Sequence, residues 1–341
     1  MDGLLVVDKP SGPTSHDVVA RVRRALRERR VGHTGTLDPA ATGVLPLVVG
    51  RATRLAQFLS SSDKSYEAVI RFGFSTDTGD AQGQVLGVQR AIDCPARDAI
   101  DAALDMFRGT FLQQPPAFSA KKIDGKRSHK LARARARGDA RPGPTDPPSL
   151  GSATPSFDAA GPPDQPDLPD AVSVTTYAVE VIGVDGDRVT LRVDCSAGFY
   201  IRSLAHDLGE RLGVGGHLIA LRRTRSGTLT LADAASLDAL EREPEVAAGR
   251  VIPLAAMLPG LAPVVLTLDG VRKAMHGREL GPSDCVSGFA NRDSGLARPS
   301  ESRTTTPESR LYRLLDPAGQ LVAIARPATA AGLLHPSVVL V

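Results

Sequence analysis

Long apolar runs are missing from this sequence of 341 residues. A membrane-spanning helix needs about 20 consecutive apolar residues, and no stretch approaches that length. The N-terminal stretch carries acidic residues and no basic leader, so a signal peptide is not expected. These absences predict a soluble protein of the cytoplasm with no membrane partner.

Cysteine is scarce. Cys94, Cys195 and Cys285 are far apart and show none of the paired spacings of a zinc site or a disulfide framework. The histidines show no metal-ligand spacing either, and no Gly-Lys-Ser/Thr sequence ends the Gly-rich loop at 32–47 as a phosphate-binding loop would require. The sequence therefore predicts no metal site and gives little support to a nucleoside-triphosphate site.

Basic residues gather in three places although the net charge is only +3. Six arginines lie between residues 21 and 30, eight lysines and arginines lie between 121 and 137, and Arg222, Arg223 and Arg225 form the third cluster. Each cluster alone is compatible with a solvated helix face. Together they favour contact with a polyanion such as RNA.

The order of expected elements predicts an α+β fold. Residues 3–8 read as a buried strand, and Thr14 with Asp17 resembles a capping box that opens a helix with an apolar face. Further helices are expected at 51–60, after Pro95 and at about 200–212, with strands at 66–72, 172–184 and 188–195. No regular βαβ period appears, which favours a mixed, largely antiparallel sheet over a doubly wound one.

Two segments interrupt this order. Residues 142–169 contain nine prolines and few large apolar residues, so they predict a disordered insertion at about 140–170. A Ser/Thr/Arg/Gly-rich stretch at 281–309 predicts a second disordered loop. We expect a main domain over 1–250 and a small β-rich domain over 251–341.

Residues 32–47 (GHTGTLDPAATGVLPL) carry the most informative loop. Three glycines allow unusual backbone angles, and Pro39 restricts Asp38 to extended conformations. The loop is therefore suited to hold one carboxylate in a fixed position. Taken alone, an Asp-Pro pair in such a loop is more often a plain turn.

This loop, with Lys9-Pro10 upstream, resembles the catalytic motifs of the TruB family of pseudouridine synthases. Further matching motifs follow in family order over about residues 3–235: DKSY at 63–66, FSTDTGD at 74–80, QPPAFSAKK at 114–122, GFYIRSL at 198–204 and GHLIALRR at 216–223. The region beyond them is similar to a PUA-like RNA-binding domain. The resemblance implies the pseudouridine synthase fold and isomerisation of uridine 55 in the T-loop of tRNA.

The resemblance also assigns roles to individual residues. Asp38 matches the nucleophile, Tyr66 the tyrosine that stacks on the target base, and Arg202 the arginine that pairs with the aspartate. Tyr200 and Leu221 match residues that line the uridine pocket, and His33 matches a histidine that helps to displace the nucleotide. Lys9 and Pro10 match a motif that supports the loop. Basic residues expected to meet RNA phosphates are Lys121, Lys122, Arg222 and Arg223.

Pseudouridine formation exchanges one glycosidic bond for another, so no cofactor, metal or energy source is expected. The attack of Asp38 on C1′ of the ribose and its attack on the base ring stay open as alternatives. Two other functions are weighed: a non-catalytic tRNA-binding or tRNA-folding protein, and a synthase that acts on another RNA, including the RNA-guided type. The motifs favour a monomeric enzyme that binds the T-stem-loop of tRNA without an obligate protein partner.

Overall fold

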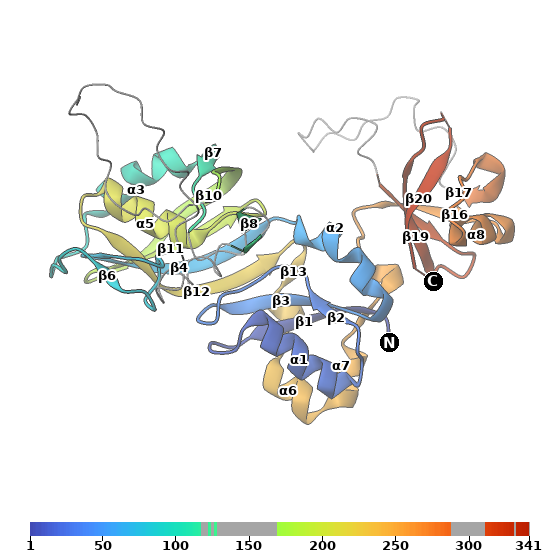
Figure 1. Ribbon diagram of the computed structural model, residues 1–341, viewed down its shortest axis with the longest axis horizontal. Coiled ribbons are helices and arrows are strands. Elements are labelled where there is room, and N and C mark those ends of the chain that lie inside the picture. The colour runs from blue at the N-terminus through green and yellow to red at the C-terminus, as the bar shows by residue number, and fades with distance from the viewer. Residues whose placement is uncertain (117–121, 124–125, 128–168, 288–310, 331, 341) are drawn as a thin grey trace, which may run out of the picture. The chain divides into compact units, whose positions relative to one another are not determined.

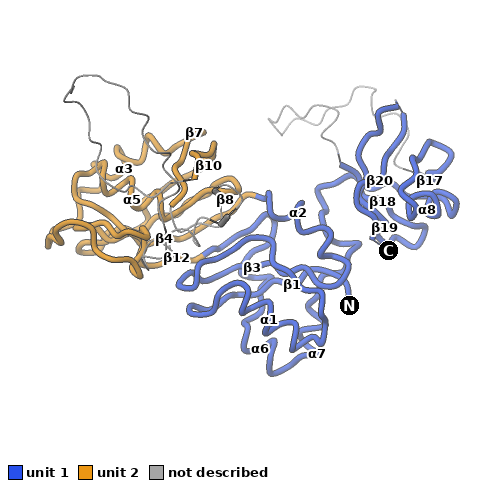
Figure 2. The backbone as a smooth tube through the Cα atoms, in the orientation of Figure 1, with its two compact units in different colours: residues 1–62, 223–341 blue, residues 63–222 orange. Residues whose placement is uncertain are grey.

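The computed structural model of the protein describes residues 1–116, 122–123, 126–127, 169–287, 311–330 and 332–340. The chain forms two compact units, which Figure 2 distinguishes by colour. Unit 1 comprises residues 1–62 and 223–341, and unit 2 comprises residues 63–222. Unit 1 thus combines two separate stretches of the sequence. The domain boundary expected at residues 250 and 251 stays a prediction.

The first sheet of unit 1 is built around the predicted N-terminal strand, β1 (Gly3–Lys9). This strand pairs antiparallel with β3 (Thr42–Val49) and β15 (Ile252–Pro253) and parallel with β14 (Ala235–Ser236), and β2 (Val31–His33) pairs with the other edge of β3. The expectation of a loop over 32–47 was therefore too wide, since only residues 34–41 lie between the two strands. The apolar run from Val44 to Val49 is buried, and burial favours a strand there.

Helices lie against this sheet (Figure 1), and the sequence pattern predicts the one that follows Thr14. The capping box at the start of α1 (Ser15–Leu26) is confirmed: Thr14 Oγ1 accepts from the Asp17 amide, and the Asp17 carboxylate accepts from the Thr14 amide at 2.8 Å. Helix α1 buries Val18 and Val22 and packs against α6 (Leu237–Arg242) and α7 (Pro244–Gly249). The helix expected at 51–60 is a 3-10 helix, η1 (Gly50–Leu55), followed by the short α2 (Ala56–Ser60).

The chain returns to unit 1 within β12 (Gly216–Ser226), a strand that the sequence pattern did not reveal. Its end forms a hairpin with β13 (Leu229–Thr230), in which Arg225 pairs with Thr230. A 3-10 turn, η3 (Leu231–Asp233), leads from there towards α6. Residue Arg223, the first residue of this returning stretch, is important for the site described below.

A second sheet of unit 1 occupies the C-terminal part of the chain, as expected. Its strand order is β17-β16-β18-β19-β20, with bounds Cys285–Ser287, Ala262–Leu266, Tyr312–Leu315, Leu321–Pro327 and Leu334–Val339. Strands β16 and β18 are parallel and the other neighbours are antiparallel. Helix α8 (Leu268–Met275), which the sequence pattern did not reveal, packs against β16, β19 and β20.

The C-terminal sheet shares a hydrophobic core with the N-terminal part of unit 1. Buried residues from both ends of the chain form one cluster: Leu4, Val48, Ala52 and Leu55, with Leu254, Met257, Leu321, Ile324 and Leu340. The 3-10 turn η4 (Leu254–Ala256) supplies the first residue of the C-terminal set. Arg51 adds polar contacts, donating from Nη1 to the carbonyl of Leu340 at 3.0 Å and pairing with Asp2 at 2.9 Å. The two sheets are therefore joined by packing as well as by the chain.

The predicted disordered loop at 281–309 is wrong for its first residues. They form the 3-10 turn η5 (Pro282–Asp284) and strand β17. The buried carboxylate of Asp284 stabilises this turn, because it accepts from Lys273 Nζ at 2.8 Å and from the Gly281 amide at 2.9 Å. Residues 288–310, and residues 142–168 of the predicted insertion, lie outside the described part of the chain.

Unit 2 contains an antiparallel sheet with the strand order β4-β11-β10-β7. The bounds are Lys64–Phe72, Arg188–Cys195, Val172–Asp185 and Gly109–Gln113. Two predicted helices, α3 (Arg97–Leu104) and α5 (Ile201–Arg211), pack against each other and against β10 and β4. The 3-10 turn η2 (Asp105–Phe107) continues α3 and buries Phe107.

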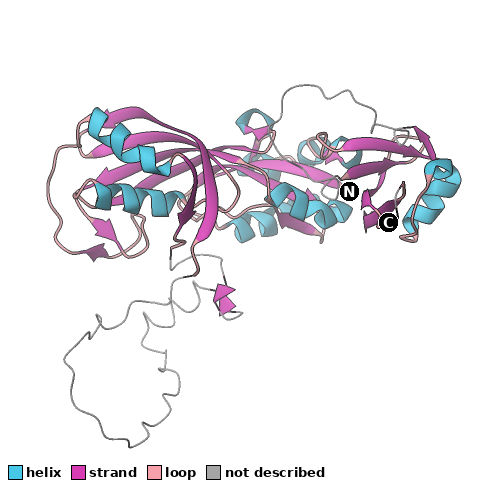
Figure 3. Cartoon of the chain, turned by 90° about the horizontal axis from the view of Figure 1, so that it is seen from above, coloured by secondary structure: helices cyan, strands magenta, loops and turns pink. Residues whose placement is uncertain are grey.

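Two small hairpins complete unit 2. Strand β5 (Ser75–Thr76), within the FSTDTGD motif, pairs with β6 (Val85–Leu86), and β8 (Lys122–Ile123) pairs with β9 (Lys126–Arg127). In Figure 3, helices in cyan lie against strands in magenta within both units. The predicted α+β class, with a mostly antiparallel sheet and a C-terminal β domain, is confirmed. No helix within the described ranges is both long and apolar enough to span a bilayer.

We predict that Leu321→Ala lowers the free energy of unfolding by about 3 kcal/mol, because it leaves a cavity in the shared core. Urea unfolding monitored by circular dichroism would measure the change. The matched control is Leu268→Ala, at a leucine that is 71% exposed, which should change stability by less than about 0.5 kcal/mol. Equal effects of the two substitutions would show that the shared core contributes little.

Candidate active site

The loop that carries Asp38 is anchored on both sides of this residue. Before it, the buried Leu37 is fixed by Ser15 of α1, whose Oγ accepts from the Leu37 amide at 2.9 Å and donates to the Leu37 carbonyl at 3.1 Å. After it, a turn is closed by the Ala41 amide, which donates to the Asp38 carbonyl at 3.1 Å, and the Gly12 amide donates to the Pro39 carbonyl at 2.9 Å. The half-buried Asp38 carboxylate therefore projects from a constrained backbone.

Lys9, at the end of β1, supports this loop from within. Its side chain is 0% exposed, and Nζ donates to the carbonyls of Pro10 at 3.0 Å, Pro39 at 3.0 Å and Ala41 at 2.7 Å. Burial lowers the pKa of Lys9 from 10.5 to about 8. The charge of Arg223 also lowers this pKa, whereas the charge of Asp38 raises it. The supporting role expected for Lys9 agrees with these contacts.

Arg223 lies on the other side of the same loop. Its side chain is among the largest fully buried ones, at 1% exposure. The guanidinium donates from Nε to the Val44 carbonyl at 2.7 Å and from Nη2 to the Gly35 carbonyl at 3.2 Å. Since the side chain is buried and these donors are engaged, Arg223 is not placed to meet an RNA phosphate. The expectation that grouped it with phosphate-binding residues needs correction on this point.

His33 ends β2 directly before the loop. Its Nδ1 is buried and has no hydrogen-bond partner among the residues that the structure describes, and its ring meets that of His16 edge-on, with 5.1 Å between centroids. Burial lowers the pKa of His33, and the charges of His16 and Arg223 lower it further. The ring is thus neutral near pH 7. His16, on the first turn of α1, was not identified from the sequence, since a single exposed histidine in a helix gives no signal.

Unit 2 holds the predicted aromatic residues. Tyr66 lies on β4 opposite Val193 of β11, and 9% of it is exposed. Tyr200 directly precedes α5, and its backbone is clamped by the side chain of Gln113. The Tyr200 amide donates to Gln113 Oε1 at 2.8 Å, and Gln113 Nε2 donates to the Tyr200 carbonyl at 3.0 Å. These contacts fix the start of the helix that carries Arg202.

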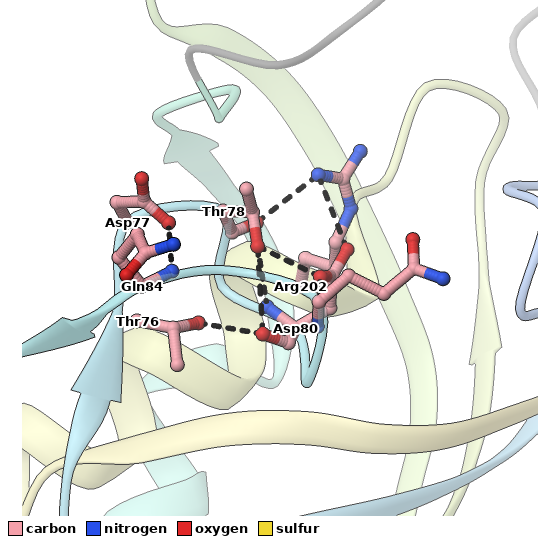
Figure 4. Close-up of polar contacts among 7 residues, drawn as sticks. Thr76, Asp77, Thr78, Asp80, Gln84 and Arg202 are labelled. Atoms are coloured by element: carbon pink, nitrogen blue, oxygen red, sulfur yellow. Dashed lines mark hydrogen bonds and ion pairs between the residues drawn. The ribbon is translucent and has the colours of Figure 1, made fainter. Parts of the chain in front are cut away.

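Arg202 lies in the first turn of α5 and is 7% exposed. Its Nη1 donates to the Thr78 carbonyl at 3.1 Å and lies 3.8 Å from an Asp80 carboxylate oxygen (Figure 4). Thr78 Oγ1 in turn donates to Asp80 Oδ1 at 2.7 Å. The Thr78–Asp80 turn thus fixes the guanidinium within unit 2. Asp38 belongs to unit 1, and the expected pairing of Asp38 with Arg202 stays a prediction.

The Thr78–Asp80 turn is itself held at several points. Two hydrogen bonds between Asp77 and Gln84 close the hairpin. The Gln84 amide donates to Asp77 Oδ1 at 2.7 Å, and the Asp77 amide donates to the Gln84 carbonyl at 3.0 Å. Buried His217 has Nδ1 3.1 Å from the Phe74 carbonyl, and its ring centroid lies 4.4 Å from that of Phe74. Burial lowers the pKa of His217. His217 belongs to a motif noted in the sequence, but its spacing did not reveal this structural contact.

The remaining predicted site residues lie along the chain as follows. Leu221 and Arg222 are half-buried residues of β12, and Lys122 begins β8. Lys121 lies outside the described part of the chain. The expected contacts of Lys122 and Arg222 with RNA stay predictions.

We predict that Lys9 makes stability depend on alkaline pH. Between about pH 8 and pH 10.5 the folded protein has released the Lys9 proton while the unfolded chain still holds it. Stability therefore rises with pH across this window. The free energy of unfolding of the wild type minus that of Lys9→Met should increase by about 2 kcal/mol between pH 8 and pH 10. Denaturant unfolding at a series of pH values measures this difference, and a difference that is flat or falls with pH would contradict the assignment.

Two family models match this chain. The model of the TruB family pseudouridylate synthase N-terminal domain matches residues 23–145, and that of the tRNA pseudouridylate synthase B C-terminal domain matches residues 202–258. Among curated proteins, tRNA pseudouridine synthase B of Solibacter usitatus is 37% identical over 346 residues, covering 100% of both chains. The protein of the same name from Thermobifida fusca is 44% identical and covers 83% of this chain and 87% of its own.

Solved structures show the same fold at lower identity. The archaeal box H/ACA sRNP Nop10-Cbf5 complex contains a chain that matches with a TM-score of 0.65 and 24% identity, covering 99% of this chain and 86% of that one. The predicted pseudouridine synthase fold is thus confirmed. The family models and the curated relatives together show that this chain belongs to the TruB family of pseudouridylate synthases.

Proposed function

We propose that this protein isomerises uridine 55 in the T-loop of tRNA to pseudouridine, with Asp38 as the nucleophile. Family membership and relatives named tRNA pseudouridine synthase B support the reaction and the RNA. The observation that best supports Asp38 is the construction of its loop. Ser15 and Lys9 hold the backbone on either side of the carboxylate. A loop of such constraint is suited to present one reactive group in a fixed geometry.

The chemistry requires a nucleophile and a route for one proton. The bond between N1 of uracil and C1′ of ribose breaks, and a bond between C5 and C1′ forms. C5 releases a proton and N1 gains one, so the isomerisation is balanced without a redox partner. The Asp38 carboxylate attacks either C1′ or the base ring and divides the reaction into two easier steps. Tyr66 stacks on the base and assists removal of the C5 proton.

The target base has to leave the helical stack before it reaches the nucleophile. We assign Tyr66, Tyr200 and Leu221 to the pocket that receives the base. The His33 ring occupies the position that the base vacates. A neutral ring suits this stacking role, and burial keeps His33 neutral by lowering its pKa.

Backbone contacts with the RNA fall to Arg222, Lys122 and Lys121, while Arg223 is excluded by its burial. The C-terminal β-rich domain, residues 251–341, would add a second RNA-binding surface of the PUA-like kind.

We further propose that the protein acts in the cytoplasm as a monomer and needs no protein partner. An assay of the purified protein alone on an unmodified tRNA transcript tests these points, and it distinguishes the enzyme from a tRNA-folding protein or an RNA-guided synthase.

Asp38→Asn should abolish turnover and leave RNA binding intact, because the amide keeps the shape of the carboxylate but is not a nucleophile. Release of tritium from transcripts labelled at C5 of uridine should fall by at least about 1,000-fold. A filter-binding assay should give an unchanged Kd. Asp238→Asn, at a carboxylate whose side chain is 68% exposed, is the matched control and should keep full activity. Turnover that persists in Asp38→Asn would remove Asp38 from its role.

Tyr66→Phe tests the hydroxyl apart from the ring. The phenylalanine ring still stacks on the base, so RNA should bind with the affinity of the wild type. Without the hydroxyl, removal of the C5 proton should slow the single-turnover rate by about 100-fold. A rate equal to that of the wild type would restrict Tyr66 to packing within the unit 2 sheet.

A further inference from the structure

We propose that Arg223 is a positioning residue that closes the Asp38 loop at its base. This inference rests on the proposed function, because it concerns the nucleophile assigned there. The expectation from the sequence and the structure differ at Arg223. The Arg222–Arg223–Arg225 cluster suggests a polyanion site, yet Arg223 is 1% exposed and its guanidinium bonds to the protein itself.

The two acceptors of Arg223 lie on either side of Asp38, one near the start of the loop and the other in β3 just beyond its end. Gly35 lies three residues before Asp38, and Val44 lies six residues after it at the start of the β3 apolar run. The guanidinium donates to both carbonyls, from Nη2 to Gly35 and from Nε to Val44. A planar fork of donors is able to join two carbonyls in a fixed geometry, which a single ammonium group does not reproduce. The bonds therefore set the separation between the ends of the loop.

Close backbone packing holds Arg223 against the loop. Gly43 has a φ of +102°, and a Cβ added there would lie 2.2 Å from the Arg223 carbonyl oxygen. Only glycine lets the two backbones approach this closely. A Cβ at Gly35 would lie 3.5 Å from Arg223 Nη1, an ordinary contact distance. Gly43 thus lies against the backbone of Arg223, and Gly35 lies beside its guanidinium.

The position of Arg223 complements that of Lys9. Lys9 donates to the carbonyls of Pro39 and Ala41, just after Asp38, whereas Arg223 donates to carbonyls at the loop ends. A buried carbonyl group that loses its donor is destabilising. A change at Arg223 is therefore expected to loosen the loop as a whole. Small displacements of a nucleophile slow a reaction strongly, by about 100-fold for 1 Å.

Arg313 provides a matched control in the same unit. It too joins two backbone carbonyls, donating from Nε to Leu261 at 3.1 Å and from Nη1 to Ala255 at 3.0 Å. It lies on β18 of the C-terminal sheet, and both of its acceptors belong to the C-terminal part of the chain. Arg313→Met removes a similar pair of hydrogen bonds without touching the loop. It separates a general loss of stability from a specific loss of positioning.

The experiment compares Arg223→Met, Arg223→Lys and Arg313→Met with the wild type on an unmodified tRNA transcript. At saturating RNA, the single-turnover rate should fall by about 100-fold in Arg223→Met and by about 10-fold in Arg223→Lys, while Arg313→Met keeps the rate of the wild type. The Kd for RNA should stay within about twofold of the wild type in all three. Arg223→Lys also serves if Arg223→Met does not fold.

Hydrogen–deuterium exchange supplies a readout that does not depend on activity. The peptide over 34–43 should exchange faster in Arg223→Lys and Arg223→Met than in the wild type, and at the rate of the wild type in Arg313→Met. Unchanged exchange of this peptide, or an unchanged single-turnover rate in both Arg223 variants, would overturn the proposal. A loss of RNA affinity as the main effect would return Arg223 to phosphate binding. Lack of pseudouridine formation by the wild type would instead refute the proposed function, and the exchange result would still test the closure of the loop.

Discussion

The backbone carbonyls around Asp38 depend on buried cationic side chains for their hydrogen bonds. Residues 34–41 lie between β2 and β3 and outside regular secondary structure, so the carbonyls of Gly35, Pro39 and Ala41 take no part in a helix or a strand ladder. Lys9 satisfies three carbonyls and Arg223 two, and both side chains are almost fully excluded from solvent. The charges of Lys9 and Arg223 lie near the Asp38 carboxylate, so none of the three is an isolated buried ion. The loop therefore stays ordered without a regular element of its own.

This dependence links the site to the whole of unit 1. Lys9 comes from the first strand, Ser15 from the first helix and Arg223 from the stretch that returns after unit 2. Strand β3, which continues from the loop, leads into Arg51 and the core shared with the C-terminal sheet. Packing at the far end of the strand is thus connected to the nucleophile through continuous structure. Residues that are distant in sequence have to fold together before the carboxylate is placed.

The sequence pattern correctly predicted those helices and strands that depend on residues close together in the chain. The capping box at Thr14 and Asp17 and the strand expected at 66–72 depend on neighbours within a few residues, and both are confirmed. Strand β12 and helix α8 were missed. Strand β12 lay inside a motif that was judged by its chemistry, and α8 lies in a region that was expected to be β-rich. The extent of the Asp38 loop was overestimated, since its glycines obscured the buried run of β3. The roles of Ser15 and Arg223 depend on contacts across 22 and 188 residues, which a local pattern does not contain.

Charge clustering in the sequence overstates the positive surface available to RNA. In the first cluster, Arg21 pairs with Glu241 and Asp238, and Arg23 donates to the Val31 carbonyl at 2.6 Å. A carboxylate partner compensates the charge, and a carbonyl partner fixes the direction of the guanidinium. Arginine presents several donors in one plane, so the same side chain suits a phosphate and a pair of backbone carbonyls equally well. Burial decides between these uses, because a buried guanidinium with backbone partners stabilises the fold while an exposed one is free to meet phosphates.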